Sequence, residues 1–135
     1  MAQQDLEAAY RRREITHDVV LQLLDKWYRV PDNAAECGVL VNCTRNLVTG
    51  VLLHSDTNYG AHISAVAVDP GHRKNGTART LVQQLQDKVR TITANVLFGE
   101  ASNIGFWVRM GFRQTEINPT MGYIQMQWNS SADKP

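Results

Sequence analysis

The segment RKNGTA, residues 73–78, places two basic side chains and a glycine between a strand-like run and an apolar pattern with helical spacing. The first backbone N–H groups of a helix lack partners within the helix, and the helix dipole adds partial positive charge there. Gly76 and the small Ala78 allow a ligand to approach the main chain closely. These features predict that the turn binds an anion such as a phosphate group.

Two common phosphate-binding patterns do not match this turn. A P-loop needs lysine directly after its second glycine. Gly71 and Gly76 have the P-loop spacing, but Thr77 stands at the lysine position. A dinucleotide-binding fingerprint needs three glycines at fixed spacing, whereas this segment has two glycines at a different spacing. The sequence therefore argues against a nucleoside triphosphatase and against a dinucleotide-binding domain.

A third pattern matches the turn and its surroundings. Residues 73–78 resemble the Gln/Arg-x-x-Gly-x-Gly/Ala signature of the GNAT superfamily, the acyl-CoA-dependent N-acyltransferases. ASNIGFWVRMGFRQ, residues 101–114, is similar to that family's second signature, in which asparagine precedes a short helix ending in Gly-Phe. YRRREITHDVVLQLL, residues 10–24, resembles the family's opening strand and helix, and residues 38–53 resemble the hairpin that follows. The resemblance covers Tyr10 to Trp128 in the order of the family.

The expected secondary structure places the turn in a mixed α/β chain. Apolar residues at helical spacing predict helices at residues 15–27, 78–89 and 102–110, the last ended by Gly111. Runs of β-branched and apolar residues predict strands at residues 37–43, 47–54, 61–68, 93–100, 112–117 and 121–128. The resemblance implies an α/β (α+β) fold with a mixed, mostly antiparallel central sheet, splayed central strands and flanking helices. We expect one domain over residues 1–128 and a polar tail over residues 129–135.

Composition indicates an ordinary globular domain. The chain has 135 residues, of which 43% are hydrophobic and 20% charged, and its net charge is +1. That balance gives no bulk electrostatic reason to expect nucleic acid or a membrane surface as a partner. The sequence has no signal-peptide pattern, and Cys37 and Cys43 are predicted to lie about 20 Å apart on one strand, too far for a disulfide. We therefore expect a cytoplasmic protein with free thiols.

The resemblance implies acetyl-CoA as the cofactor and assigns residues to its parts. The turn amides of the family bind the pyrophosphate, and one strand lends backbone groups to the pantetheine. A further asparagine contacts the cofactor from the far side. Carried over to this sequence, the cofactor-binding residues are Val66, Ala67, Val68, Arg73, Lys74, Asn75, Gly76, Thr77, Ala78, Arg79 and Asn103.

The acid and base positions of the family hold unusual residues here. The family often has tyrosine as the acid where this chain has Trp107, and glutamate as the base where it has Ser64. An indole N–H donates a hydrogen bond but does not release its proton near neutral pH. Glu100 and His62 are the substitute bases expected to face the cleft, so the predicted catalytic residues are Glu100, His62 and Trp107. No metal is expected, because two histidines without a third ligand do not indicate a zinc site.

Two functions from different classes fit these residues. The first is an N-acetyltransferase in which an amine of a small molecule, a peptide or a protein directly attacks the acetyl group. The second is a GNAT-like protein that binds CoA, has little catalytic activity and acts mainly by docking to a partner, an option that Trp107 and Ser64 keep open. The short connection VPDNAAEC, residues 30–37, predicts an open acceptor site. A homodimer is also left open.

Overall fold

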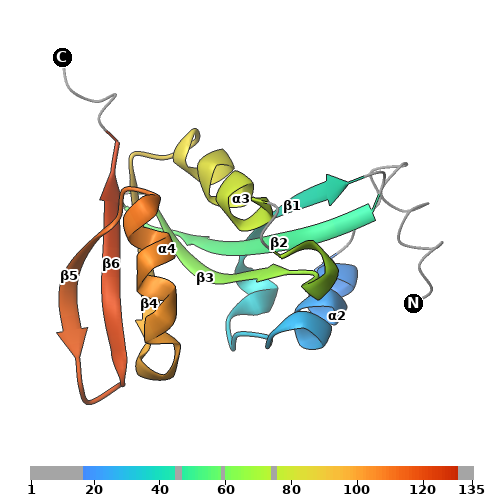
Figure 1. Cartoon of the computed structure of the whole chain (residues 1–135). Helices are drawn as coiled ribbons and strands as arrows, with labels where there is room; N and C mark the ends of the chain where they lie inside the picture. The colour runs from blue at the N-terminus through green and yellow to red at the C-terminus, as the bar shows by residue number, and fades with distance from the viewer. Residues whose placement is uncertain (1–16, 45–46, 59, 74–75, 131–135) are drawn as a thin grey trace.

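The computed structural model describes residues 17–44, 47–58, 60–73 and 76–130 and shows one six-stranded sheet with helices on both sides (Figure 1). The strand order is β1-β2-β3-β4-β6-β5. The strands are β1 (Gly38–Thr44), β2 (Leu47–Asp56), β3 (Ala61–Val68), β4 (Thr91–Leu97), β5 (Arg113–Asn118) and β6 (Tyr123–Asn129). The helices are α2 (His17–Trp27), α3 (Thr77–Gln86) and α4 (Ile104–Arg109), with 3-10 turns η1 (Ala34–Glu36), η2 (Pro70–His72) and η3 (Phe98–Asn103).

The two central strands, β3 and β4, are the sheet's only parallel neighbours among the described residues. They pair only over residues 61–63 and 92–94 and then separate, although both strands continue. Their divergence opens the middle of the sheet toward the carboxyl ends of both strands. The predicted fold class, with its mostly antiparallel sheet and splayed central strands, is confirmed.

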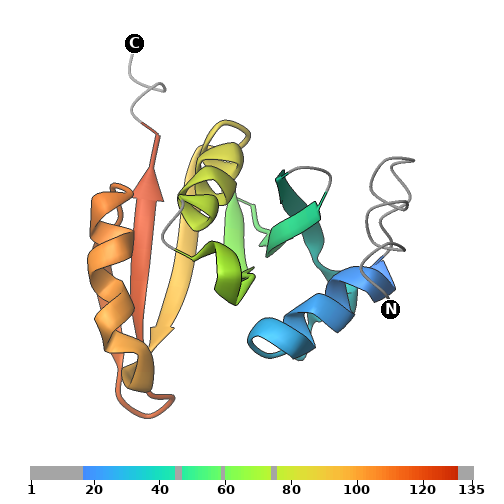
Figure 2. The same ribbon diagram turned by 45° about the vertical axis from the view of Figure 1, so that its right-hand side comes forward.

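Helices α2 and α3 lie on opposite sides of strands β2 and β3 (Figures 1 and 2). The inner face of α2 carries Val19, Val20, Leu23, Leu24 and Trp27, all buried against residues of β2 and β3. On α3 the buried residues Leu81, Val82 and Leu85 pack in a second core that also contains Trp107 of α4 and Met126 of β6. Because each helix buries one apolar stripe, α2 and α3 are held on opposite faces of the sheet.

The end of β4 differs from the sequence prediction. Residues 93–100 were expected to form a strand, but β4 ends at Leu97 and the chain continues as η3. Phe98 N–H donates to Gly122 O (2.8 Å) at the β5–β6 turn, and Glu100 then adopts a non-helical conformation with φ −116°. Glu100 therefore lies in a turn and not at a strand end. The end of β4 is set by its pairing with β6, which begins just after the β5–β6 turn.

The other elements lie within a few residues of their predicted bounds. Helix α4 ends in the expected way: Gly111 has φ +92°, Gly111 N–H donates to Val108 O, and Phe112 N–H donates to Trp107 O. Helix α3 stops at Gln86, three residues before its predicted end. The two cysteines are free thiols, as predicted, although Cys37 stands just before β1 rather than on it. Residues 5–14 and the tail after Ser130 lie outside the described residues.

Candidate functional site

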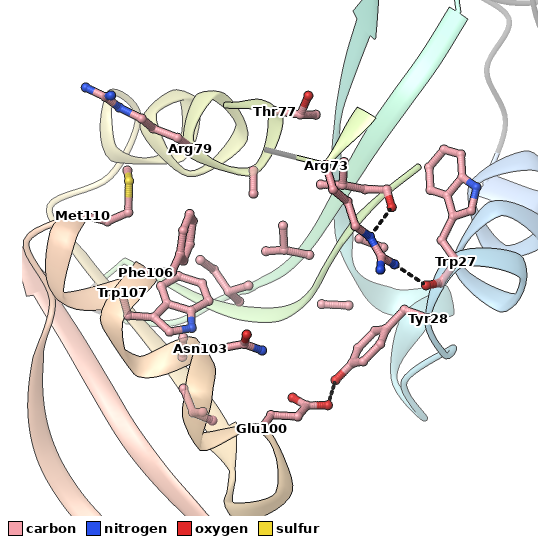
Figure 3. Close-up of a pocket in the computed structure, with 18 of the residues that line it drawn as sticks. Trp27, Tyr28, Arg73, Thr77, Arg79, Glu100, Asn103, Phe106, Trp107 and Met110 are labelled. Carbon is pink, nitrogen blue, oxygen red and sulfur yellow. Dashed lines mark hydrogen bonds between the residues drawn. The ribbon is translucent and has the colours of Figure 1, made fainter. Parts of the chain in front are cut away.

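A cleft of about 1110 Å³ occupies the gap between the splayed strands (Figure 3). Its wall is made by β3, the start of α3, β4, the η3–α4 segment and the end of α2. The predicted site residues that line it are Val66, Ala67, Val68, Arg73, Gly76, Thr77, Ala78, Arg79, Glu100, Asn103 and Trp107. Segments far apart in the sequence therefore meet around one space. Lys74 and Asn75 lie outside the described residues.

The amino-terminal end of α3 opens into this cleft. Gly76 caps the helix with φ +79°, and a Cβ placed there would meet no atom within 4 Å. The described atoms provide no side-chain hydrogen bond to this cap, and the helical ladder begins with Thr80 N–H donating to Gly76 O (2.9 Å). The N–H groups of residues 77–79 come before that first bond, so this end is open to an anionic ligand.

Gly50 on β2 fixes where α3 begins. A Cβ on Gly50 would lie 2.6 Å from Thr77 Cγ2 and 3.0 Å from Leu81 Cδ1, so only glycine permits this close approach. The buried Thr77 side chain thus packs against the sheet, and its main chain is left at the cleft. Sequence reasoning did not identify this role, although a glycine inside an apolar strand is a known signal of close backbone approach.

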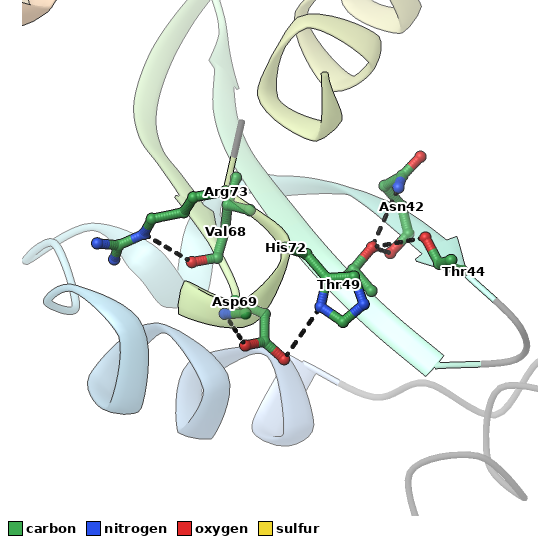
Figure 4. Close-up of polar contacts among 8 residues, drawn as sticks. Asn42, Thr44, Thr49, Val68, Asp69, His72 and Arg73 are labelled. Carbon is green, nitrogen blue, oxygen red and sulfur yellow. Dashed lines mark hydrogen bonds and ion pairs between the residues drawn. The ribbon is translucent and has the colours of Figure 1, made fainter. Parts of the chain in front are cut away.

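Arg73 connects the turn to the end of β3 and to the end of α2. Its Nε donates to Val68 O (3.4 Å) at the end of β3, and its second guanidinium nitrogen donates to Trp27 O (3.3 Å) at the end of α2 (Figures 3 and 4). Asp69 caps the same turn by accepting from Gly71 N–H (2.9 Å), and its other oxygen lies 3.7 Å from His72 Nδ1. The side chain of Arg73 is therefore engaged in holding the turn in place.

The β4-facing edge of β3 is open over residues 64–68. Pairing between β3 and β4 ends at Ile63 and Ala94, and on its other edge β3 remains paired with β2. No described strand covers this edge beyond Ile63. Main-chain groups of the segment that includes Val66, Ala67 and Val68 consequently face a ligand-sized space, where an extended chain can pair with them.

Trp107 and Ser64 line the cleft as neutral groups. Trp107 is 9% exposed and makes edge-to-face contacts with Phe106 (5.1 Å between ring centroids) and Phe112 (5.0 Å). The Ser64 hydroxyl accepts hydrogen bonds from Asn33 Nδ2 (3.3 Å) and Cys37 Sγ (3.6 Å). Neither side chain can take up or release a proton near neutral pH.

Glu100 is the only carboxylate among the described residues that line the cleft. It is met there by Tyr28, whose hydroxyl donates to Glu100 Oε1 at 2.6 Å (Figure 3). Burial raises the pKa of Tyr28, and the hydrogen bond and charge of Glu100 raise it further, whereas the nearby Arg29 guanidinium lowers it. Sequence reasoning missed Tyr28. Its place directly after Trp27, the last residue of α2, was the only local signal.

His62 stands apart from the cleft lining. It pairs with Thr93 where β3 and β4 still run together, and His62 Nδ1 lies 2.8 Å from Thr93 Oγ1. Burial lowers the pKa of His62. Its predicted role as a base remains a prediction. Across the β2–β3 ladder His62 pairs with Ser55, while His54 pairs with Ile63, and the described residues contain no cluster of metal ligands.

Charge is distributed unevenly around the cleft. Four arginines line it, namely Arg29, Arg73, Arg79 and Arg109, against the single carboxylate of Glu100. Such an excess of positive charge in a concave site attracts a polyanionic ligand. In the part of the chain that the structure describes, no helix is long and apolar enough to cross a membrane.

A scan against protein-family models matches residues 3–112 to the acetyltransferase (GNAT) family. The chain belongs to this family. A search of curated proteins finds no match. Solved structures of GNAT proteins nevertheless resemble the chain in fold, at sequence identities too low to carry more than the fold.

Three of these structures illustrate the likeness. The ribosomal-protein-S18-alanine N-acetyltransferase of Escherichia coli has a TM-score of 0.66 at 17% identity, with 100% of this chain and 95% of that chain covered. The Salmonella typhimurium protein yncA, solved with acetyl-CoA, gives 0.62 at 20%, covering 91% and 89%. A Bacillus anthracis protein assigned as a streptothricin acetyltransferase, solved with acetyl coenzyme A, gives 0.62 at 15%, covering 70% of this chain and only 63% of its own length.

Proposed function

We propose that this GNAT protein transfers an acetyl group from acetyl-CoA to an amine. The observation that carries the proposal is the open end of α3 beside the unpaired edge of β3. A glycine cradle, a free strand edge and a cleft of about 1110 Å³ together suit a long ligand with phosphates at one end. The Salmonella typhimurium and Bacillus anthracis structures, which are similar in fold, were solved with acetyl-CoA.

The residues of the cleft fit the parts of acetyl-CoA. The main chain of residues 76–79 holds the pyrophosphate, and Arg79 adds positive charge at that end. The open edge of β3 at Val66, Ala67 and Val68 pairs with the pantetheine, and Asn103 meets the ligand from the α4 side. When bound, the cofactor supplies an acetyl group activated as a thioester. Trp107 closes the wall beside it and helps to exclude water.

Glu100 takes the role of base in this proposal. It lies in the cleft, it is the only described carboxylate there, and a general base contributes about 10²–10⁴ in rate. A main-chain N–H near Val68, on the open edge of β3, donates a hydrogen bond to the acetyl carbonyl. Loss of the family's tyrosine at position 107 is tolerable, because a thiol with a pKa near about 8.5 is already a fair leaving group.

The acceptor amine enters from the side of α2 and η3. The connection between α2 and β1 is short and contains only the 3-10 turn η1 among its regular elements. A short connection leaves room for a peptide or protein amine as well as for a small molecule. Acetyl transfer measured over a panel of small amines, polyamines and lysine peptides identifies the class, and activity on small polyamines alone would contradict an open acceptor site.

Two measurements test the function itself. Calorimetric titration with acetyl-CoA and CoA is expected to show binding, and the absence of binding would refute the cofactor assignment. Thiol release in the presence of the amine panel then separates an enzyme from a binding protein. Tight binding of CoA without amine-dependent thiol release would support the alternative, a CoA-binding docking protein. The observation that favours this alternative is that Trp107 and Ser64 occupy the family's acid and base positions.

A further inference from the structure

The contact between Tyr28 and Glu100 joins two segments that are separated by 72 positions in the sequence. Tyr28 follows the last residue of α2, and Glu100 lies in η3 on the other side of the cleft (Figure 3). Both side chains line the cleft, and the bond between the phenol oxygen and Oε1 is short at 2.6 Å. This hydrogen bond places the carboxylate beside the end of α2, in a cleft whose other charged lining residues are the four arginines.

The carboxylate of Glu100 still has unused capacity to accept hydrogen bonds. An ionised carboxylate offers about four lone-pair positions on two oxygens, and Tyr28 occupies one position on Oε1. Within the described part of the chain Glu100 forms no ion pair. Arg73 donates to two main-chain carbonyls, and Arg29 lies over the Tyr28 ring at 5.0 Å, where its charge acts on the phenol. Tyr28 is therefore the described residue that holds the Glu100 side chain by a hydrogen bond.

We propose that Tyr28 is the positioning residue of the acceptor subsite, because it holds the carboxylate of Glu100, the proposed base, in the cleft. This inference rests on the proposed function and deepens it by naming the residue that places the base. As in the proposed function, Glu100 takes the proton of the acceptor ammonium group, and Tyr28 acts through Glu100. Because the contact depends on the chain between α2 and β1 as well as on η3, the subsite exists only in the folded domain.

The proton and electron count of the transfer follows from this arrangement. The nitrogen of a primary ammonium gives one proton to the Glu100 carboxylate and regains its lone pair. That pair forms the new amide N–C bond while the thioester C–S bond breaks with its electrons on sulfur. The second nitrogen proton neutralises the thiolate, and Glu100 returns its own proton to solvent. Tyr28 keeps its phenolic proton throughout, since that proton is donated to Glu100.

The first experiment observes the subsite in the absence of acetyl-CoA. The protein is labelled with [13Cζ]tyrosine, and the Tyr28 signal is assigned by its absence in Tyr28→Phe. Titration with n-butylammonium chloride is expected to shift this signal saturably, whereas n-butanol leaves it in place. In Glu100→Gln the ammonium-dependent shift is lost. An equal response to butanol, or a shift that persists in Glu100→Gln, would overturn the proposal.

An alkaline titration of the same label tests the contact itself. After burial, the hydrogen bond and charge of Glu100 are the next causes of the raised pKa of Tyr28. The pKa of Tyr28 is therefore expected to fall in Glu100→Gln, where the charge is removed and the shape is kept. An unchanged value would mean that the phenol and carboxylate are not in contact in solution, and the subsite would have to be abandoned.

The second experiment measures kinetics of Tyr28→Phe, Glu100→Gln and the double variant. Loss of a hydrogen bond to a charged group predicts that Tyr28→Phe lowers kcat/KM for the amine by about tenfold to a hundredfold. The KM for acetyl-CoA is expected to stay unchanged. Because Tyr28 acts through Glu100, the double variant should be no slower than Glu100→Gln. Tyr123→Phe is the matched control, since it removes another hydrogen-bonded hydroxyl, which accepts from Asn118 Nδ2 (3.2 Å) outside the cleft lining.

The outcomes distinguish this proposal from others. Losses that multiply in the double variant would show that Tyr28 acts independently of Glu100, for example as the proton donor to the leaving thiol. Rescue of Tyr28→Phe by thioesters of more acidic thiols would show the same, and either result overturns the positioning role. Failure of acetyl-CoA to bind would instead refute the proposed function, while the ammonium titration would still report on the subsite.

Discussion

The two ends of the cleft are built in different ways. At the α3 end the proposed binding groups belong to the main chain: Gly76 with φ +79°, the first amides of the helix and the open edge of β3. At the other end the proposed binding groups belong to side chains, the phenol of Tyr28 and the carboxylate of Glu100. One end is made from a continuous stretch of sequence, and the other from residues that meet only after folding.

This difference explains how the two ends can be specialised. A main-chain site is defined by conformation, so its side chains can vary while the anion is still bound. A site made of side chains depends on the identity of each residue, so a single substitution can change which ligand it binds. Under the proposed function, the α3 end binds the cofactor that the family shares, and the Tyr28–Glu100 end binds the acceptor.

A change at Trp107, in the wall of the cleft, is expected to have the largest effect, and that effect is on stability. Trp107 is 9% exposed and contacts two aromatic rings, so Trp107→Ala should lower the free energy of unfolding by about 3–5 kcal/mol. Denaturant unfolding measures this loss. Val108→Ala is the control on the same helix, because Val108 is 56% exposed and its truncation should stay within about 0.5 kcal/mol. Equal effects of the two changes would contradict the packing described for α4.

The α3 end alone is tested by a charge placed in its cradle. Gly76→Asp should weaken acetyl-CoA binding by on the order of a hundredfold, because a carboxylate there repels the phosphates. Gly122→Asp is a close control: Gly122 also has positive φ (+76°) and open space, but it lies at the β5–β6 turn. Calorimetry compares the two variants. A similar loss in both would mean that backbone strain, and not the cradle, lowers the affinity.

A change at Arg73, which joins the turn before α3 to the end of α2, is expected to have a smaller effect on binding. Arg73→Gln removes the donors to Val68 O and Trp27 O, and it should reduce acetyl-CoA affinity about tenfold, equivalent to about 1.4 kcal/mol. Because Trp27 precedes Tyr28, the amine kcat/KM should fall as well. Arg113→Gln makes the same change of charge on the exposed strand β5 and serves as control. A loss confined to cofactor affinity would show that the two ends are independent.

The same contrast decides what could be predicted from the sequence. Residues 61–68 were expected to form a strand and do, because a run of small and β-branched residues is a local property. The Gly76 turn was likewise read from adjacent residues. In contrast, Tyr28 has no pattern that relates it to Glu100, since their contact depends on the packing of α2 and on the path of η3. The early end of β4 at Leu97 also depends on a distant partner, Gly122.

A change at His62, where β3 and β4 are still paired, is expected to have the smallest effect, which is on the pH dependence of stability. Burial lowers the pKa of His62 below its ordinary value of 6.5, so the unfolded chain binds a proton more readily than the folded chain. The stability that this group contributes is complete above pH 6.5 and is lost as pH falls through the folded pKa. His62→Asn, whose amide can still hydrogen-bond to Thr93 Oγ1, should therefore reduce the loss of unfolding free energy on acidification.

Denaturant unfolding at several pH values below 7 measures the slope of unfolding free energy against pH. An unchanged slope would mean that His62 is as well hydrated in the folded protein as in the unfolded chain, and that β3 and β4 separate earlier than Ile63 and Ala94.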